Sequence, residues 1–287
     1  HLAAGSRAQL GRNSMSLKNR IGVDLGRMIS AEEAIEWAGA NDVSYVESQV
    51  DLAPNELASM IARAPAIRAA HERLGVHFGL HTLSGVNIAE VSPFLADAAD
   101  EYLKAYIDIA DHTGAEWVVV HAGYHFTADY EMRRKAGLER LARACDYAEA
   151  KNVRLLLENP NREPDDAEVH YLGASIEECH YYFGNLSSPN LSWSFTVNHA
   201  HLYPEGIDGF IDALGIERLV EVRLADCRGT VEEHLQPGDG TIDFSAMFAR
   251  LEGAGFDGFY MNNFGTLDDM LAGRDYLLGK AGEAGIT

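Results

Sequence analysis

Three polar side chains that can bind a metal ion or carry a proton stand where apolar runs of the chain end: His81, His121 and Glu158. Short apolar runs bounded by turn residues are typical of strands buried on both faces, as in a parallel sheet. Two imidazoles and a carboxylate can hold Zn²⁺ or a similar ion and leave positions open for water. We therefore expect a metal site at these three residues, although a single histidine or acid at a strand end is more often only structural.

The stretch that ends in Glu158 is the clearest of the three. Pro160 cannot donate a hydrogen bond to a sheet and biases Asn159 away from helix, so the strand is expected to stop near Glu158. A carboxylate at that end of a parallel strand faces the loops that gather ligands and catalytic groups. We expect Glu158 to act as a general base or a metal ligand, with His121 as a second catalytic residue.

Polar residues also stand at the ends of the other expected strands. They are Asp24, Glu47, Thr196 with His199, Arg223 with Asp226, and Asn262 with Asn263. In a closed barrel such positions converge on one opening, however far apart they lie in the chain. The residues that we expect to bind substrate there are Glu47, His199, Asp226, Asn262 and His234.

A second group of metal-capable residues lies in two segments expected to be loops. Glu232 stands two residues before His234, and His199 follows the sixth expected strand. An acid and two histidines can bind an ion, but loop residues of these types are usually only solvated. The nearby Gly238-Asp239-Gly240 permits close approach to a ligand and equally suits an ordinary turn.

The elements that must position these residues alternate between strand and helix through the whole chain. Strands are expected at residues 20–25, 42–47, 75–81, 116–121, 153–158, 190–195, 219–224 and 258–262. Eight such units without a linker favour a single (β/α)₈ barrel of the α/β class. An open doubly wound sheet is the alternative, but no glycine-rich phosphate turn follows the first strand.

Composition limits the class of protein. The chain has 287 residues, is 47% hydrophobic, and carries 44 acidic against 23 basic residues, for a formal charge of −21. That charge disfavours nucleic acid as a partner, and no apolar run approaches the ~20 residues needed to cross a membrane.

Three widely spaced cysteines point to a reducing, cytoplasmic setting. Residues 1–14 read as an expression-tag remnant before a barrel domain at 15–287.

The order of these motifs resembles the xylose isomerase-like TIM barrel superfamily, whose members include sugar isomerases and epimerases, hydroxypyruvate isomerase, inosose dehydratase and endonuclease IV. The resemblance rests on Leu80-His81, Val120-His121-Ala-Gly123, Leu157-Glu158-Asn159, Asn198-His199-Ala-His201, Leu224-Ala-Asp226 and His234 to Asp243. It runs from about residue 21 to 282 and implies a metal-dependent barrel.

The resemblance is incomplete at the metal site. The usual isomerase or epimerase site binds one ion through Glu, Asp, His and Glu, of which only Glu158 matches. Thr196, Arg223 and either Asn262 or Asn263 stand at the other three positions. Arg cannot lose its charge to coordinate a cation, so Arg223 is expected to pair with an acid or to grip a substrate anion. By contrast, five residues match positions that endonuclease IV-like members use for additional metals: His81, His121, His199, Glu232 and His234.

Together these observations lead us to expect an enzyme of the isomerase, epimerase or lyase type. It would remove a proton next to a carbonyl of a small polyhydroxylated or keto compound, with Arg223 stabilising a developing enolate. One divalent ion (Zn, Mn or Co) is the expected cofactor, and no nucleotide-binding motif is present. The alternative is a catalytically inactive or metal-free barrel retained as a ligand-binding or assembly subunit. Association into homo-oligomers stays open.

Overall fold

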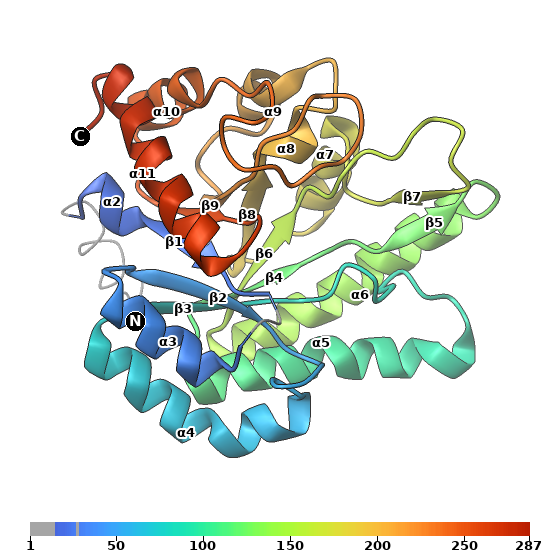
Figure 1. The fold of residues 1–287 in the computed structure, drawn as a ribbon. Helices are drawn as coiled ribbons and strands as arrows, with labels where there is room; N and C mark the ends of the chain where they lie inside the picture. The colour runs from blue at the N-terminus through green and yellow to red at the C-terminus, as the bar shows by residue number, and fades with distance from the viewer. Residues whose placement is uncertain (1–14, 27–28) are drawn as a thin grey trace.

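Eight parallel strands form a closed barrel in the computed structural model, which describes residues 15–26 and 29–287 (Figure 1). The barrel strands are β1 Ile21–Asp24, β2 Tyr45–Gln49, β3 His77–His81, β4 Trp117–Val120, β6 Arg154–Glu158, β8 Leu191–Thr196, β9 Leu219–Leu224 and β10 Phe259–Asn262. They follow one another around the barrel in chain order, and β1 closes it by pairing with β10 and β2. The expected (β/α)₈ barrel is thus confirmed, while the expected tag lies outside the described residues.

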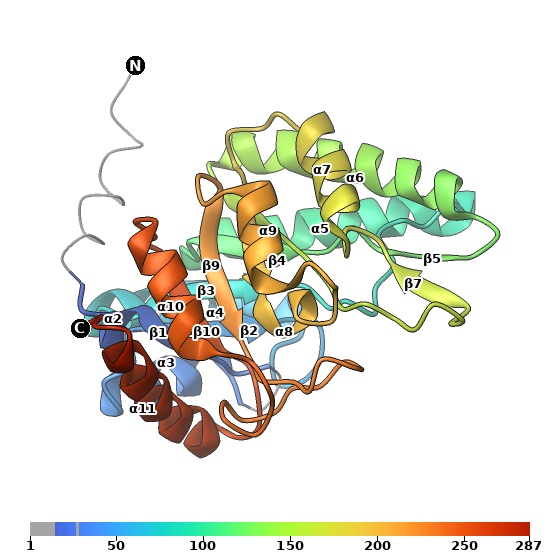
Figure 2. The same cartoon turned by 90° about the horizontal axis from the view of Figure 1, so that it is seen from above.

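Helices surround the barrel on its outer face (Figure 2). They are α2 Leu17–Arg20, α3 Ala31–Ala40, α4 Leu57–Leu74, α5 Pro93–Thr113, α6 Tyr130–Lys151, α7 Ile176–Asn185, α8 Val197–Ala200, α9 Gly206–Leu214, α10 Phe244–Gly253 and α11 Leu267–Glu283. The side chains of Ser30, Ser175 and Asp243 accept hydrogen bonds from the first turns of α3, α7 and α10. Such caps satisfy amide groups that the helix itself leaves unpaired.

The lower part of the barrel interior is aromatic. Alternate residues of each strand point inward, so Tyr45, Trp117 and Phe259 meet inside the barrel with ring centroids 4.8 to 5.7 Å apart. These rings are fully buried and separate the mouth of the barrel from its opposite end. The site therefore has a rigid floor.

A polar layer lies on top of the aromatic one. Glu47, Glu221 and Arg223 have no exposed surface. The Tyr45 hydroxyl donates to Glu221 Oε2 at 2.7 Å, and the Trp117 indole N–H donates to the Tyr45 oxygen at 3.0 Å. The aromatic floor is thus hydrogen-bonded to the charged layer above it.

One pair of strands was not expected from the sequence. β5 Tyr124–Phe126 pairs antiparallel with β7 Val169–Tyr171, outside the barrel and beside the start of α6 (Figure 1). The sequence predicted only loops there, because three-residue strands are too short to show a period of two. The pair joins the loops that follow β4 and β6, and it forms a wall next to the barrel mouth.

Among the described residues, no helix is both long enough and apolar enough to span a membrane.

Gly79 lies against the aromatic floor, so a methyl group added at this position should lower the stability of the fold. A Cβ at Gly79 would lie 2.8 Å from Trp117 Nε1 and 3.1 Å from the Tyr45 hydroxyl. We expect Gly79→Ala to lower the free energy of unfolding by about 1–3 kcal/mol, as overpacked cores do. Urea unfolding followed by circular dichroism measures the change. Gly279→Ala, at an open and exposed position of α11, is the control and should be neutral or stabilising by up to about 1 kcal/mol. Equal effects of the two substitutions would contradict the packing argument.

Candidate active site

A cavity of about 320 Å³ opens at the carboxyl ends of the barrel strands. It is lined by Gln49, His81, Ser84, His121, Glu158, Pro160, Asn161, His199, Glu232, His234 and Asn263. The cavity therefore brings together side chains that the chain separates by up to 214 positions, from Gln49 to Asn263 (263 − 49). Two groups of potential metal ligands lie within it.

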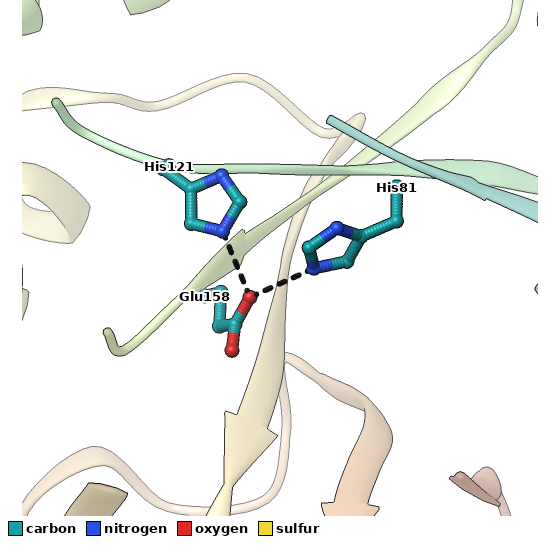
Figure 3. A group of neighbouring side chains, drawn as sticks. All are labelled: His81, His121 and Glu158. Carbon is teal, nitrogen blue, oxygen red and sulfur yellow. Dashed lines mark hydrogen bonds and ion pairs between the residues drawn. The ribbon is translucent and has the colours of Figure 1, made fainter. Parts of the chain in front are cut away.

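The first group joins His81, His121 and Glu158, which come from the ends of β3, β4 and β6 (Figure 3). The Nε2 atoms of both histidines lie 3.0 Å from the same oxygen, Oε2 of Glu158. The other oxygen, Oε1, accepts a hydrogen bond from the Thr196 hydroxyl at 2.5 Å. All four side chains are buried.

The surroundings of His121 favour one protonation form of its ring. The Thr82 hydroxyl can donate its single proton to the Val119 carbonyl, 3.0 Å away, and its oxygen lies 3.1 Å from His121 Nδ1. That arrangement assigns the ring proton to Nδ1 and leaves Nε2 with a lone pair directed at Glu158. Burial lowers the pKa of His121, which further favours the neutral ring. A cation between Nε2 and the carboxylate would satisfy both.

The second group joins His199, Glu232 and His234, which line the same cavity. The Nδ1 atoms of His199 and His234 donate to the backbone carbonyls of Asn159 and Asn263, at 2.9 and 2.7 Å. Since a carbonyl only accepts, each ring in its neutral form directs a bare Nε2 elsewhere. Those atoms lie 3.4 and 2.7 Å from Glu232 Oε1. Burial opposes a second proton on His234, but Glu232 outweighs burial and raises the pKa of that ring, so a proton or a metal ion is favoured at its Nε2.

The chemistry of both groups fits a divalent ion. Metal-binding histidines characteristically donate their second ring N–H to a carbonyl, hydroxyl or carboxylate, as His121, His199 and His234 do. Glu232 Oε1 is buried and has no partner with hydrogen-bond geometry among the described residues, although two imidazole nitrogens face it. An ion held by Glu232 Oε1 and the two Nε2 atoms would give this oxygen the partner that it lacks.

The carboxylates of both groups are held in the ionised form that a metal ligand requires. Burial opposes ionisation of Glu158, but imidazoles that carry a proton on Nε2, together with the charge of Arg223, outweigh it and hold the pKa of Glu158 well below the ordinary value. Burial likewise opposes ionisation of Glu232, and contacts with protonated His199 and His234 lower its pKa to about 2. A cation in place of those protons would hold both carboxylates ionised in the same way.

Arg223 lies beneath the cavity and does not line it. Its Nη1 donates to Glu47 and, at 2.9 Å, to Glu221, while its Nη2 donates to Asp24. Its Nε lies 4.0 Å from Glu158 Oε1 and has no hydrogen-bond partner among the described residues. The side chain is fully buried, so it acts on the cavity through Glu158.

Three of the residues expected to bind substrate lie outside the cavity. Glu47 is two residues before the end of β2, which places it in the layer below, against Arg223. Asn262 shares its face of β10 with Tyr260, and its amide donates to Met270 O in α11 at 2.9 Å. Asp226 accepts four backbone N–H groups of its own loop, including those of Gly238 and Gly240 at 2.9 and 3.0 Å.

His199 and His234, the other two residues expected to bind substrate, do line the cavity. Gln49, Ser84 and Asn161 also line it and were not singled out from the sequence. Gln49 is the last residue of β2, and Asn161 directly follows Pro160. A search that took the terminal residue of each strand and the first loop residues after it would have included both.

Comparisons with known proteins agree with this architecture. A family model described as xylose isomerase-like TIM barrel matches residues 34–268. An uncharacterized protein of Methanocaldococcus jannaschii is 25% identical over 213 residues, which cover 72% of this chain and 70% of that protein.

Solved structures with this fold include sugar epimerases and a nuclease. A D-tagatose 3-epimerase-like protein superimposes with a TM-score of 0.77 at 20% identity, covering 93% of this chain and 98% of that one. The 3-keto-D-glucoside 4-epimerase of E. coli has a TM-score of 0.72 at 16% identity, covering 92% and 99%. Endonuclease IV from Thermus thermophilus has a TM-score of 0.70 at 22% identity, covering 92% and 100%. Because the family model spans most of the sequence, the chain belongs to the xylose isomerase-like TIM barrel family.

Proposed function

We propose that this chain is a metal-dependent enzyme that removes a proton next to a carbonyl of a small polyhydroxylated or keto compound, leading to isomerisation, epimerisation or elimination. The proposal rests on two clusters of residues, each with two imidazoles and one carboxylate. The lone pairs of both clusters converge inside one cavity at the barrel mouth. The names of structural neighbours support the substrate class, since several are sugar epimerases.

The residues that would hold metal ions are assigned from these two groups. His81, His121 and Glu158 would hold one ion, and His199, Glu232 and His234 a second. Mixed nitrogen and oxygen donors suit Zn²⁺, Mn²⁺ or Co²⁺. Such an ion polarises a substrate carbonyl and acidifies the neighbouring C–H group.

The placement of the carboxylates favours a reaction with proton transfer on one side of the substrate. Among the described residues that line the cavity, the only carboxylates are Glu158 and Glu232, and each faces two imidazoles. The last strand offers Asn262, directed away from the cavity, and Asn263. With no free acid opposite Glu158, elimination or a one-base isomerisation is favoured over a symmetrical epimerisation.

Hydrolysis of a phosphate ester is the second candidate, and the closeness of the two groups favours it. His199 Nδ1 lies 3.7 Å from Glu158 Oε1, so ions at both groups would share one cavity, as in two-metal phosphoesterases. The structural likeness to an endonuclease is consistent with that chemistry. The formal charge of −21 argues against a DNA substrate, so a small phosphate ester would be the target.

Metal content after native purification is the first test of the proposal. We expect close to two equivalents of Zn, Mn or Co by elemental analysis, and loss of about one equivalent in either His121→Ala or His234→Ala, since each variant removes one ligand of one group. His180→Ala, an exposed histidine of α7, is the matched control and should retain the wild-type content. Wild-type protein without metal would support the inert ligand-binding barrel instead, and equal loss in the control would contradict the assignment of metal to these two groups.

Exchange of substrate hydrogen with solvent is the test of the reaction. In D₂O, the metal-loaded enzyme should place deuterium at the carbon next to the carbonyl of a ketose, keto acid or inosose, as measured by NMR. Glu158→Gln should slow that exchange by about 10²–10⁴-fold, the usual range for a residue that organises proton transfer. Release of phosphate from small esters without any exchange would favour the second candidate and contradict the first.

A further inference from the structure

A second cavity, of about 450 Å³, lies beside the first and is larger than it. The β5 and β7 pair contributes one wall, through His125, His170 and Tyr171. We call it the hairpin cavity. Asn161 lines both cavities, so the two cavities are neighbours on either side of this residue. Its volume falls within the range of small-molecule sites.

The histidines of the hairpin cavity offer hydrogen-bond acceptors. His125 and His170 are opposite each other in the strand pair and stack with ring centroids 5.7 Å apart. His125 Nδ1 donates to Phe126 O, and His170 Nε2 donates to Ala167 O, both at 2.8 Å. In the neutral rings, the second nitrogen of each is therefore an acceptor.

The charges of the hairpin cavity also favour a ligand rich in donors. Three carboxylates line it, from Glu163, Asp165 and Glu178, against the one guanidinium of Arg162. Arg162 is itself engaged by Asp165 at 2.7 Å and by the Leu202 carbonyl at 3.3 Å. A phosphate or carboxylate ligand would meet net repulsion here. Hydroxyl groups can donate to the carboxylates without that cost.

Aromatic rings supply the apolar part of the hairpin cavity. Tyr130, Tyr171 and Tyr203 line it, so aromatic carbon atoms and hydroxyl groups both border the space. A wall that combines aromatic side chains with many acceptors suits a ring with C–H groups on its faces and hydroxyl groups at its edge.

We propose that the hairpin cavity is a subsite for a second neutral, polyhydroxylated ring, so that the substrate is a two-ring glycoside and not a free monosaccharide. The proposal rests on the proposed function for its first ring, which would lie at the metal-binding groups. The shared residue Asn161 marks the junction between the two rings.

Equilibrium binding of matched sugars tests this subsite. The probes are maltose, cellobiose and trehalose against glucose and methyl glucoside, measured by calorimetry on the metal-loaded protein. We expect at least one disaccharide to bind tenfold or more tightly than the monosaccharides. Tyr171→Ala should reduce that ratio below threefold. Tyr124→Ala is the matched control, because Tyr124 is opposite Tyr171 in the same strand pair but does not line the hairpin cavity, and it should keep the ratio.

Several outcomes would overturn the subsite. The first is equal affinity for monosaccharides and disaccharides. The second is a ratio of disaccharide to monosaccharide affinity that survives Tyr171→Ala or that is lost equally in Tyr124→Ala. The third is displacement of the disaccharide by putrescine at similar concentration, which would indicate an ammonium site. Glu158→Gln separates this proposal from the previous one. That variant should lose hydrogen exchange and keep the disaccharide preference. A preference without any exchange in the wild type would leave the subsite standing and refute the proposed reaction.

Discussion

The buried guanidinium of Arg223 is the charge on which the rest of the barrel mouth depends. It is fully enclosed and contacts Asp24, Glu47 and Glu221, with Glu158 at 4.0 Å. Breaking a buried pair of this kind leaves uncompensated charge and is strongly destabilising. Burial also raises the pKa of Glu47 well above its ordinary value, against the effect of Arg223, which favours the neutral form of this carboxyl group. The Arg223 guanidinium thus offsets much of the charge repulsion among the buried carboxylates.

The same charge bears on the metal sites that we propose. A unit charge attracts Glu158 across 4.0 Å by about 4 kcal/mol at an effective dielectric of about 20, and it repels a cation placed there by at least as much. Under the proposed function, ions would therefore be disfavoured beside Arg223 and would bind at the rim, where His121 and His234 each face an acid. Thr196 completes this arrangement by donating to the Glu158 oxygen that faces Arg223. Thr196 and Arg223, which the resemblance places at two of the usual ligand positions, thus both face the same oxygen of Glu158.

The sequence predicted the barrel and the gathering of His81, His121 and Glu158 in one place, because both follow from strand ends. Apolar runs that stop at His81, His121 and Glu158 place those residues at one rim once the sheet closes. The sequence did not predict how deep a side chain lies in the barrel or whether it points inward or outward. Glu47 lies one layer too deep, because β2 continues two residues beyond it, and Asn262 occupies the outward face of its strand. A shift of one residue reverses the side of a strand, and sequence patterns do not locate strand ends that finely.

Loop geometry accounts for what the sequence left open. Glu232 and His234 lie in a long segment between β9 and α10 whose path depends on the carboxylate of Asp226, which collects four backbone N–H groups. The β5 and β7 pair depends on contacts between the loops after β4 and β6, and its partners Tyr124 and Tyr171 are far apart in the chain. Neither arrangement leaves a local pattern in the sequence.

Anomalous diffraction from crystals grown with Mn²⁺ or Zn²⁺ tests the central claim most directly. The account predicts two peaks at the barrel mouth, one within coordination distance of the Nε2 atoms of His81 and His121, the other within that distance of His199 and His234, and none beside Arg223. A single peak that displaces the Arg223 guanidinium, or no peak at either group, would contradict it.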